Sequence, residues 1–214
     1  MSELEDEAPG DRWAELAAAL ARDEDDGRLP DETGATLAAV LLLLYDKDSA
    51  PHIVLTRRTN HVAAHKGEIS LPGGAYEEDK DLSLLHTALR EAAEEVGIEA
   101  AGLRILGRLP LVYTMSSNFA IMPYVAATPQ RPSFYPDPIE VAEVLEVPLE
   151  ALRDPAALQE EDWDFDGMAR RIWFYAHGEY KIWGATARIL SEFLAVLEKV
   201  TLRAAGANER GGIS

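Results

Sequence analysis

The sequence predicts a protein of the α/β class, and two observations support this prediction. Short apolar segments typical of strands alternate along the chain with segments whose apolar residues recur at helical spacing. The longest apolar run, at 37–45, is typical of a buried strand and is too short to span a bilayer. The segment 82–96 has the spacing of a helix that packs on a core, and Gly97 is a natural C-terminal cap for it.

The individual elements follow from propensity and from turn residues. Strands are predicted at 36–46, 51–57, 103–109 and 119–128, with a turn at 47–50 and a hairpin over 162–180 that turns at 177–178. Helices are predicted at 12–22, 82–96, 149–153 and from 181 onward, and the last of these should bury Ile189, Phe193, Leu194 and Leu197.

Length and charge limit the organisation of the chain and its partners. The 214 residues, 47% of them hydrophobic, predict one domain at 36–200, an acidic N-terminal extension with a helix at 1–35, and a flexible tail at 201–214. The net charge of −18 argues against nucleic-acid binding. The absence of cysteine excludes disulfides and a thiol nucleophile. The acidic start is unlike a signal peptide, so we expect a cytoplasmic protein with no membrane partner.

Three glutamates on the helix predicted at 82–96 are the first candidate site. Glu91, Glu94 and Glu95 share one side of that helix because residues three and four apart are neighbours on a helix surface. Their mutual repulsion would be cancelled by a hard divalent cation such as Mg²⁺, which prefers carboxylate oxygen. Glutamates at this spacing are more often solvated surface, so the spacing alone leaves both interpretations open.

A cationic segment precedes the Pro-Gly-Gly turn that leads to this helix. It contains Arg57, Arg58, His65 and Lys66. Guanidinium groups match phosphate oxygens bidentately, so the segment could hold an anionic substrate. The alternative is that these charges pair with surface acids. A zinc site at His61 and His65 is disfavoured because no third ligand type is nearby.

The helix and its flanks resemble a known family. Arg90, Glu91, Glu94, Glu95 and Gly97 resemble the second half of the Nudix box of the Nudix hydrolases. In the first half, the glycine and the glutamate of the family would fall at Tyr76 and Leu82, and Gly74 and Asp81 are the nearest candidates.

The flanking residues resemble the coenzyme A diphosphatase branch of that family. The matching residues are Leu55, Thr56, Arg58, His65, Gly67, Pro72, Gly73, Gly74, Asp81, Ser83, Thr87, Ala88, Leu89, Arg90 and Glu91. The segment 180–187 resembles the same branch, and there we expect Trp183 to pack rather than to stack on a base. The chain departs from the branch at Leu71, where the branch has phenylalanine, and by one extra residue around 77–80.

The resemblance implies a Nudix α/β/α sandwich with a mixed β-sheet and a metal-dependent hydrolase. It implies Mg²⁺ or Mn²⁺ held by Glu91, Glu94 and Glu95, with Arg90 aligning the carboxylates, so that the catalytic residues are Arg90, Glu91 and Glu94. The substrate-binding residues would be Arg57, Arg58, His65, Lys66, Gly73 and Gly74. The general base is left unassigned, and Glu140 or Glu143 could add a further carboxylate.

The implied substrate is a small nucleotide-type diphosphate. Coenzyme A or its acyl derivatives would give 3′,5′-ADP and (acyl-)4′-phosphopantetheine. The alternatives are ADP-ribose, dinucleoside polyphosphates or nucleoside triphosphates, and, in another class, a non-catalytic nucleotide sensor. A homodimer is compatible with the sequence, and the N-terminal helix could be an interface or a lid.

Overall fold

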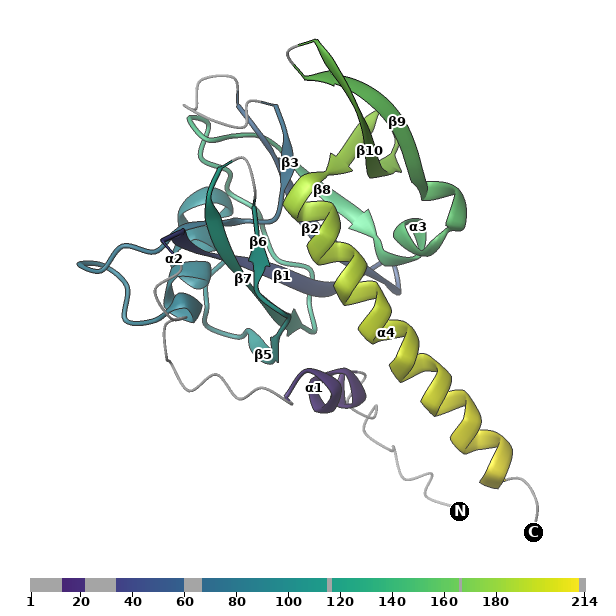
Figure 1. Ribbon diagram of the computed structural model, residues 1–214. Coiled ribbons are helices and arrows are strands. Elements are labelled where there is room, and N and C mark those ends of the chain that lie inside the picture. The colour runs from purple at the N-terminus through teal and green to yellow at the C-terminus, as the bar shows by residue number, and fades with distance from the viewer. Residues whose placement is uncertain (1–12, 22–33, 60–66, 115–116, 166, 212–214) are drawn as a thin grey trace.

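The computed structural model describes residues 13–21, 34–59, 67–114, 117–165 and 167–211 (Figure 1). The elements are, in order, α1 (Ala14–Leu20), β1 (Thr36–Lys47), β2 (Ala50–Arg58), β3 (Ile69–Ser70), β4 (Gly73–Ala75), α2 (Leu84–Val96), β5 (Arg104–Arg108), β6 (Val112–Tyr113), β7 (Phe119–Thr128), β8 (Val141–Pro148), α3 (Leu149–Arg153), the 3-10 turn η1 (Pro155–Ala157), β9 (Leu158–Phe165), β10 (Met168–His177), β11 (Tyr180–Trp183) and α4 (Gly184–Gly211).

The main sheet is built around β1, the apolar run of the sequence. β1 pairs antiparallel with β2 and with β4, and parallel with β7 over the whole length of β7. β8 adds to the outer side of β2, and β5 and β6 pair with β7. The sheet is therefore mixed, as expected, and β4 lies beside the first part of β1, at Ala38–Val40.

Alternate residues of β1 face two separate cores, because side chains of a strand point to opposite faces in turn. Leu41 and Leu43 join the core beneath α2, whereas Leu42 and Leu44 join the core that includes α1 and α4. Figure 1 shows α2 on one side of the sheet and α1 and α4 on the other. The predicted α/β/α arrangement is confirmed.

The chain after η1 forms a second, three-stranded sheet rather than the predicted hairpin. β10 is its central strand, with β9 on one side and β11 on the other. Residues 181–183, predicted to open the last helix, form β11, because they pair with β10 in the register Phe174↔Trp183. Trp183 packs edge-to-face on Trp163 at 5.1 Å between ring centroids, so its predicted packing role is confirmed.

The last helix, α4, buries the predicted apolar side toward the core. Ile189 and Phe193 are fully buried, and Leu194 and Leu197 pack partly against the same core. α4 continues to Gly211, through residues that the sequence assigned to a tail. None of the helices in the described part of the chain is long and apolar enough to cross a membrane.

Candidate active site

Helix α2 presents the predicted glutamates beside the Pro-Gly-Gly turn. The helix begins at Leu84, because the hydroxyl of Ser83 accepts a hydrogen bond from the backbone N–H of His86 at 3.1 Å and caps it. It ends before Gly97, which adopts the left-handed conformation (φ 73°) of a C-terminal cap. Buried residues at helical spacing (Leu84, Ala88, Ala92 and Val96) fasten the helix to β1.

Glu95 is the most buried of the three glutamates, with 3% of its surface exposed. Its carboxylate accepts a hydrogen bond from the backbone N–H of Gly73 at 3.3 Å and one from Arg58 Nη1 at 3.5 Å. Burial outweighs these two contacts and raises the pKa of Glu95 to about 8. The contacts with Arg58 and Gly73 therefore do not fully offset the cost of burying an ionised Glu95.

Glu91 lies directly against the backbone of Gly74. A Cβ atom at position 74 would come within 2.4 Å of the Glu91 carboxyl carbon, so the site requires glycine there. Burial also raises the pKa of Glu91 above its ordinary value, against the opposing effect of Arg90. Gly73 has a related requirement, because a Cβ on it would meet the backbone oxygen of Ala39 at 2.3 Å.

Arg90 connects the loop before α2 to two of the glutamates. Its Nε and Nη2 donate to the two oxygens of Asp81 at 2.8 and 2.9 Å. Its Nη1 donates to Glu91 at 2.7 Å and to Glu94 at 3.0 Å. Arg90 thus contacts two of the helix carboxylates, and its role in aligning them stays a prediction.

Asp81 is the nearest candidate for the carboxylate that the usual spacing of the family would place at Leu82. Its side chain is fully buried, whereas Leu82 is 91% exposed. The Arg90 guanidinium holds the pKa of Asp81 well below its usual range. His86 Nδ1 lies 3.2 Å from Asp81, a further contact that no local pattern predicts. Of Asp81 and Leu82, it is therefore Asp81 that is buried and in contact with the arginine.

The two arginines at the end of β2 point to opposite faces of the sheet. Arg58 reaches Glu95 on the α2 side, whereas Arg57 Nε donates to Glu143 of β8 at 3.2 Å. Glu143 also accepts a hydrogen bond from the hydroxyl of Tyr180 in β11 at 2.8 Å. The structure thus brings Arg58 to the glutamates and does not bring Arg57 there, so the substrate role of Arg57 stays a prediction.

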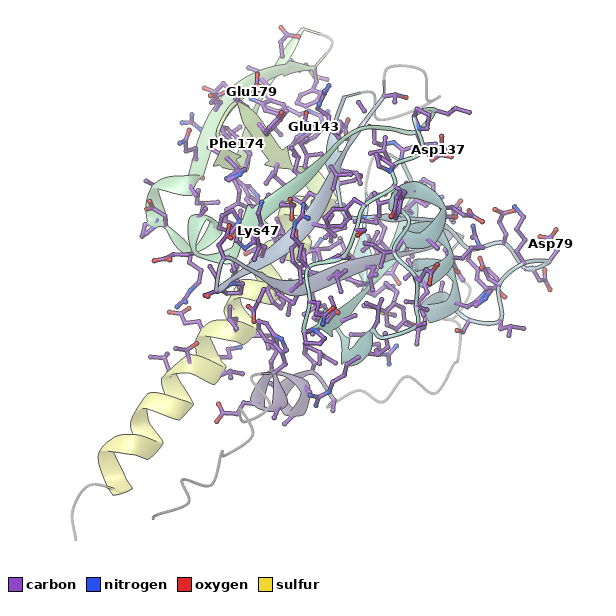
Figure 2. The ribbon with its side chains drawn as sticks, turned by 180° about the vertical axis from the view of Figure 1, so that it is seen from behind. Lys47, Asp79, Asp137, Glu143, Phe174 and Glu179 are labelled. Carbon is purple, nitrogen blue, oxygen red and sulfur yellow. The ribbon has the colours of Figure 1, made fainter. Side chains whose placement is uncertain are left out.

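Of the two further carboxylates considered, Glu140 is the one beside the site. Its charge raises the pKa of both Glu91 and Glu95. Figure 2 labels Glu143 on the side of the molecule that also carries Phe174 of the second sheet. The remaining cationic candidates, His61, His65 and Lys66, lie outside the described residues.

The donor set fits a hard divalent cation, although the carboxylates are turned toward arginines. No three acidic or imidazole side chains in the described ranges converge on one point as they stand. Glu91 and Glu95 nevertheless have pKa values raised by burial, which marks negative charge that a cation would compensate. Carboxylate oxygens suit Mg²⁺ or Mn²⁺ rather than a soft metal.

A separate cleft of about 770 Å³ lies at the start of β2, the end of the strand opposite to Arg58. It is lined by Pro51, Leu149, Glu150, Ala151, Arg153, Asp154 and Pro155. None of the three glutamates lines it, and its one guanidinium, that of Arg153, lies among the carboxylates of Glu150 and Asp154. We therefore place the candidate active site at α2.

Comparison with known proteins agrees with this geometry. The model of the NUDIX domain matches residues 35–167. The uncharacterized Nudix hydrolase NudL of Photorhabdus laumondii is 37% identical over 156 residues, which cover 72% of this chain and 81% of that protein. A MutT/nudix family protein from Enterococcus faecalis shares the fold with a TM-score of 0.53 and 17% identity, covering 80% of this chain and 65% of that one. A C. elegans Ap4A hydrolase in a binary complex gives a TM-score of 0.52 and 15% identity, covering 77% of this chain and 98% of that one. The extent of the family match and the identity to NudL show that this chain belongs to the Nudix hydrolase family.

Proposed function

We propose that this enzyme hydrolyses the diphosphate linkage of coenzyme A or its acyl derivatives, with Mg²⁺ or Mn²⁺, and releases 3′,5′-ADP and (acyl-)4′-phosphopantetheine. Nudix hydrolases act on nucleotide-type diphosphates and generally use divalent metal ions, so the reaction class follows from the family. The choice of coenzyme A rests on the segments that resemble the coenzyme A diphosphatase branch.

The observation that carries the proposal is the position of Arg58. This residue belongs to the coenzyme A-type segment at 55–67, and it contacts Glu95 of the Nudix helix at 3.5 Å. Its buried Nε has no hydrogen-bond partner among the described residues. An unsatisfied buried donor is costly, and a phosphate oxygen of the substrate would satisfy it.

The chain's own residues prepare the reaction in distinct ways. Glu91, Glu94 and Glu95 would hold the metal, which when bound polarises the diphosphate and lowers the pKa of a bound water. Arg90 fixes the directions of Glu91 and Glu94, while the N–H of Gly73 fixes Glu95. One of the glutamates accepts the proton of the attacking water.

A substrate panel tests the proposal. We expect the highest kcat/KM for coenzyme A and acetyl-coenzyme A, compared with ADP-ribose, diadenosine tetraphosphate and nucleoside triphosphates, each with Mg²⁺ and with Mn²⁺. Dephospho-coenzyme A should show a higher KM, because it lacks the 3′-phosphate that cationic side chains would bind. Fast turnover of another compound with none of coenzyme A would overturn the choice of substrate and leave the reaction class intact.

A further inference from the structure

We propose that Tyr180 and Glu143 are positioning residues for this active site. They lie on the face of the main sheet opposite to α2 and hold Arg57 there, beside a β-bulge of β8. They thereby fix the end of β2, from which the next residue, Arg58, reaches Glu95. The inference rests on the proposed function only in requiring a measurable diphosphate hydrolysis, and it applies to whichever Nudix substrate the enzyme turns over.

One carboxylate oxygen joins three strands on that face. Glu143 Oε2 accepts a hydrogen bond from Tyr180 Oη at 2.8 Å and another from Arg57 Nε at 3.2 Å. Tyr180 belongs to β11, Glu143 to β8 and Arg57 to β2, so the contact ties the second sheet to the main sheet. The side chains of Arg57 and Glu143 are 38% and 40% exposed, so burial alone does not fix them.

The ladder between β2 and β8 is irregular at this contact. Arg57 pairs with Glu143, but the next residue, Arg58, pairs with Val141, so Ala142 has no partner on β2. In a regular strand, residues 141 and 143 would point to the same face. Here Val141 joins the core beneath α2, whereas Glu143 faces Tyr180. The bulge at Ala142 therefore turns Val141 and Glu143 to opposite faces of the sheet.

Arg58 is the last residue of β2, and it pairs with Val141 just past the bulge of β8. Arg58 follows Arg57 directly and points to the other face, where it reaches Glu95. Past the bulge, the N–H of Thr59 donates to the carbonyl of Glu140 at 2.9 Å, so the end of β2 stays attached to the segment that precedes β8. The bulge re-aims the side chains of β8, because it lets Val141 face the core beneath α2 while Glu143 faces Tyr180 and Arg57. The Tyr180–Glu143–Arg57 contact stabilises the other side of the same bulge.

A double-mutant cycle tests whether Tyr180 acts through Arg58. Tyr180→Phe, Arg58→Ala and the double variant are compared in kcat and KM, together with their melting temperatures. We expect Tyr180→Phe alone to lower kcat/KM by about 5-fold, from the loss of one charge-assisted hydrogen bond. The double variant should be as slow as Arg58→Ala alone, because coupled residues are not additive. Additive effects, or wild-type kinetics in Tyr180→Phe, would overturn the proposal.

Tyr45→Phe is the matched control, because it too removes a hydrogen bond from a tyrosine hydroxyl to a glutamate of β8. Tyr45 Oη donates to Glu146 of β8 at 3.0 Å, three residues beyond Glu143 and on the α2 side of the sheet. It should keep wild-type kcat/KM even if its melting temperature falls. An equal loss of activity in Tyr45→Phe would show a general stability effect and would also overturn the proposal.

A second variant keeps the test decisive if Tyr180→Phe does not fold. Glu143→Gln retains an oxygen acceptor for Tyr180 and weakens the ion pair with Arg57. It then replaces Tyr180→Phe in the cycle, and the double variant with Arg58→Ala should again be as slow as Arg58→Ala alone. A negative result in the substrate panel and a negative result in this cycle can be told apart. If the wild-type enzyme hydrolyses ADP-ribose or diadenosine tetraphosphate instead of coenzyme A, the cycle is run on that compound.

Discussion

Asp81 accepts two hydrogen bonds from the guanidinium of Arg90, from Nε at 2.8 Å and from Nη2 at 2.9 Å. The aspartate precedes helix α2, whereas the arginine lies in its middle, so the pair fastens the loop to the helix. The third nitrogen of Arg90 is left to contact Glu91 and Glu94. A buried residue outside the glutamate cluster thereby fixes the directions of two of its carboxylates.

Asp81→Asn should therefore impair both stability and catalysis. We expect the free energy of unfolding to fall by about 3 kcal/mol, because Arg90 loses its buried counter-charge. We expect kcat to fall by about 10- to 100-fold as Glu91 and Glu94 lose their orientation. Asp79→Asn is the matched control, since Asp79 lies exposed in the same loop and points away from the body in Figure 2. Equal effects in both variants would contradict the role given to Asp81.

Glu95→Gln should separate activity from stability. Removing a proposed metal ligand should lower kcat by at least about 100-fold. In the metal-free protein the same change should leave the melting temperature equal or higher, because burial disfavours the ionised carboxylate. Calorimetry in a chelator and kinetics with Mn²⁺ measure the two effects, with Glu99→Gln, at an exposed position after the helix, as control. Wild-type kcat in Glu95→Gln would remove it from the metal site.

The stability of the metal-free protein should depend on pH through Glu95. Its pKa is raised from 4.5 to about 8 in the folded protein, so the folded state favours the protonated carboxyl. This contribution is fully present below pH 4.5 and is lost as the pH rises toward 8. Thermal unfolding in a chelator across this range should show a decline that Glu95→Gln reduces. Added Mg²⁺ or Mn²⁺ should stabilise the protein more at pH 8 than at pH 5, whereas equal stabilisation at both would argue against ligation by Glu95.

Gly74→Ala should disable the site with little change in the fold. The added methyl group would meet the carboxylate of Glu91 within 2.4–2.6 Å, so that side chain must move. We expect a loss of kcat of about 10-fold or more, since misplacement by a fraction of an ångström is enough to slow catalysis. Gly102→Ala is the control, because a Cβ there meets no atom within 4 Å and only the positive φ of 90° is strained. It should lower the melting temperature slightly and keep kcat.

Local patterns in the sequence predict much of this fold. The strand at 119–128 and the helix at 149–153 have the predicted bounds, because their apolar alternation and flanking residues are local signals. Residues 181–183 were wrongly assigned to a helix because their strand conformation depends on pairing with β10, and that pairing is not visible locally. Propensity is a weak guide wherever tertiary pairing decides.

The candidate site could be predicted only in part for a similar reason. The spacing of Glu91, Glu94 and Glu95 shows that they share a side of the helix, but not which of them is buried. Strand alternation alone would have separated Arg57 from Arg58, since neighbouring residues of a strand face opposite sides. The contacts of Glu143 with Arg57 and Tyr180 needed the structure, because they join residues from three strands far apart in the chain.

The parallel pairing of β1 with β7 also has a consequence for synthesis on the ribosome. β1 begins at Thr36, and its parallel partner ends at Thr128. At typical translation rates the most apolar strand of the protein waits roughly 5 to 20 s for that partner to emerge. Its early partner is β2, which pairs across a short turn with the last four residues of β1, 44–47. The other edge stays open through this interval, so nascent chains that stall before residue 119 should be the species that chaperones bind.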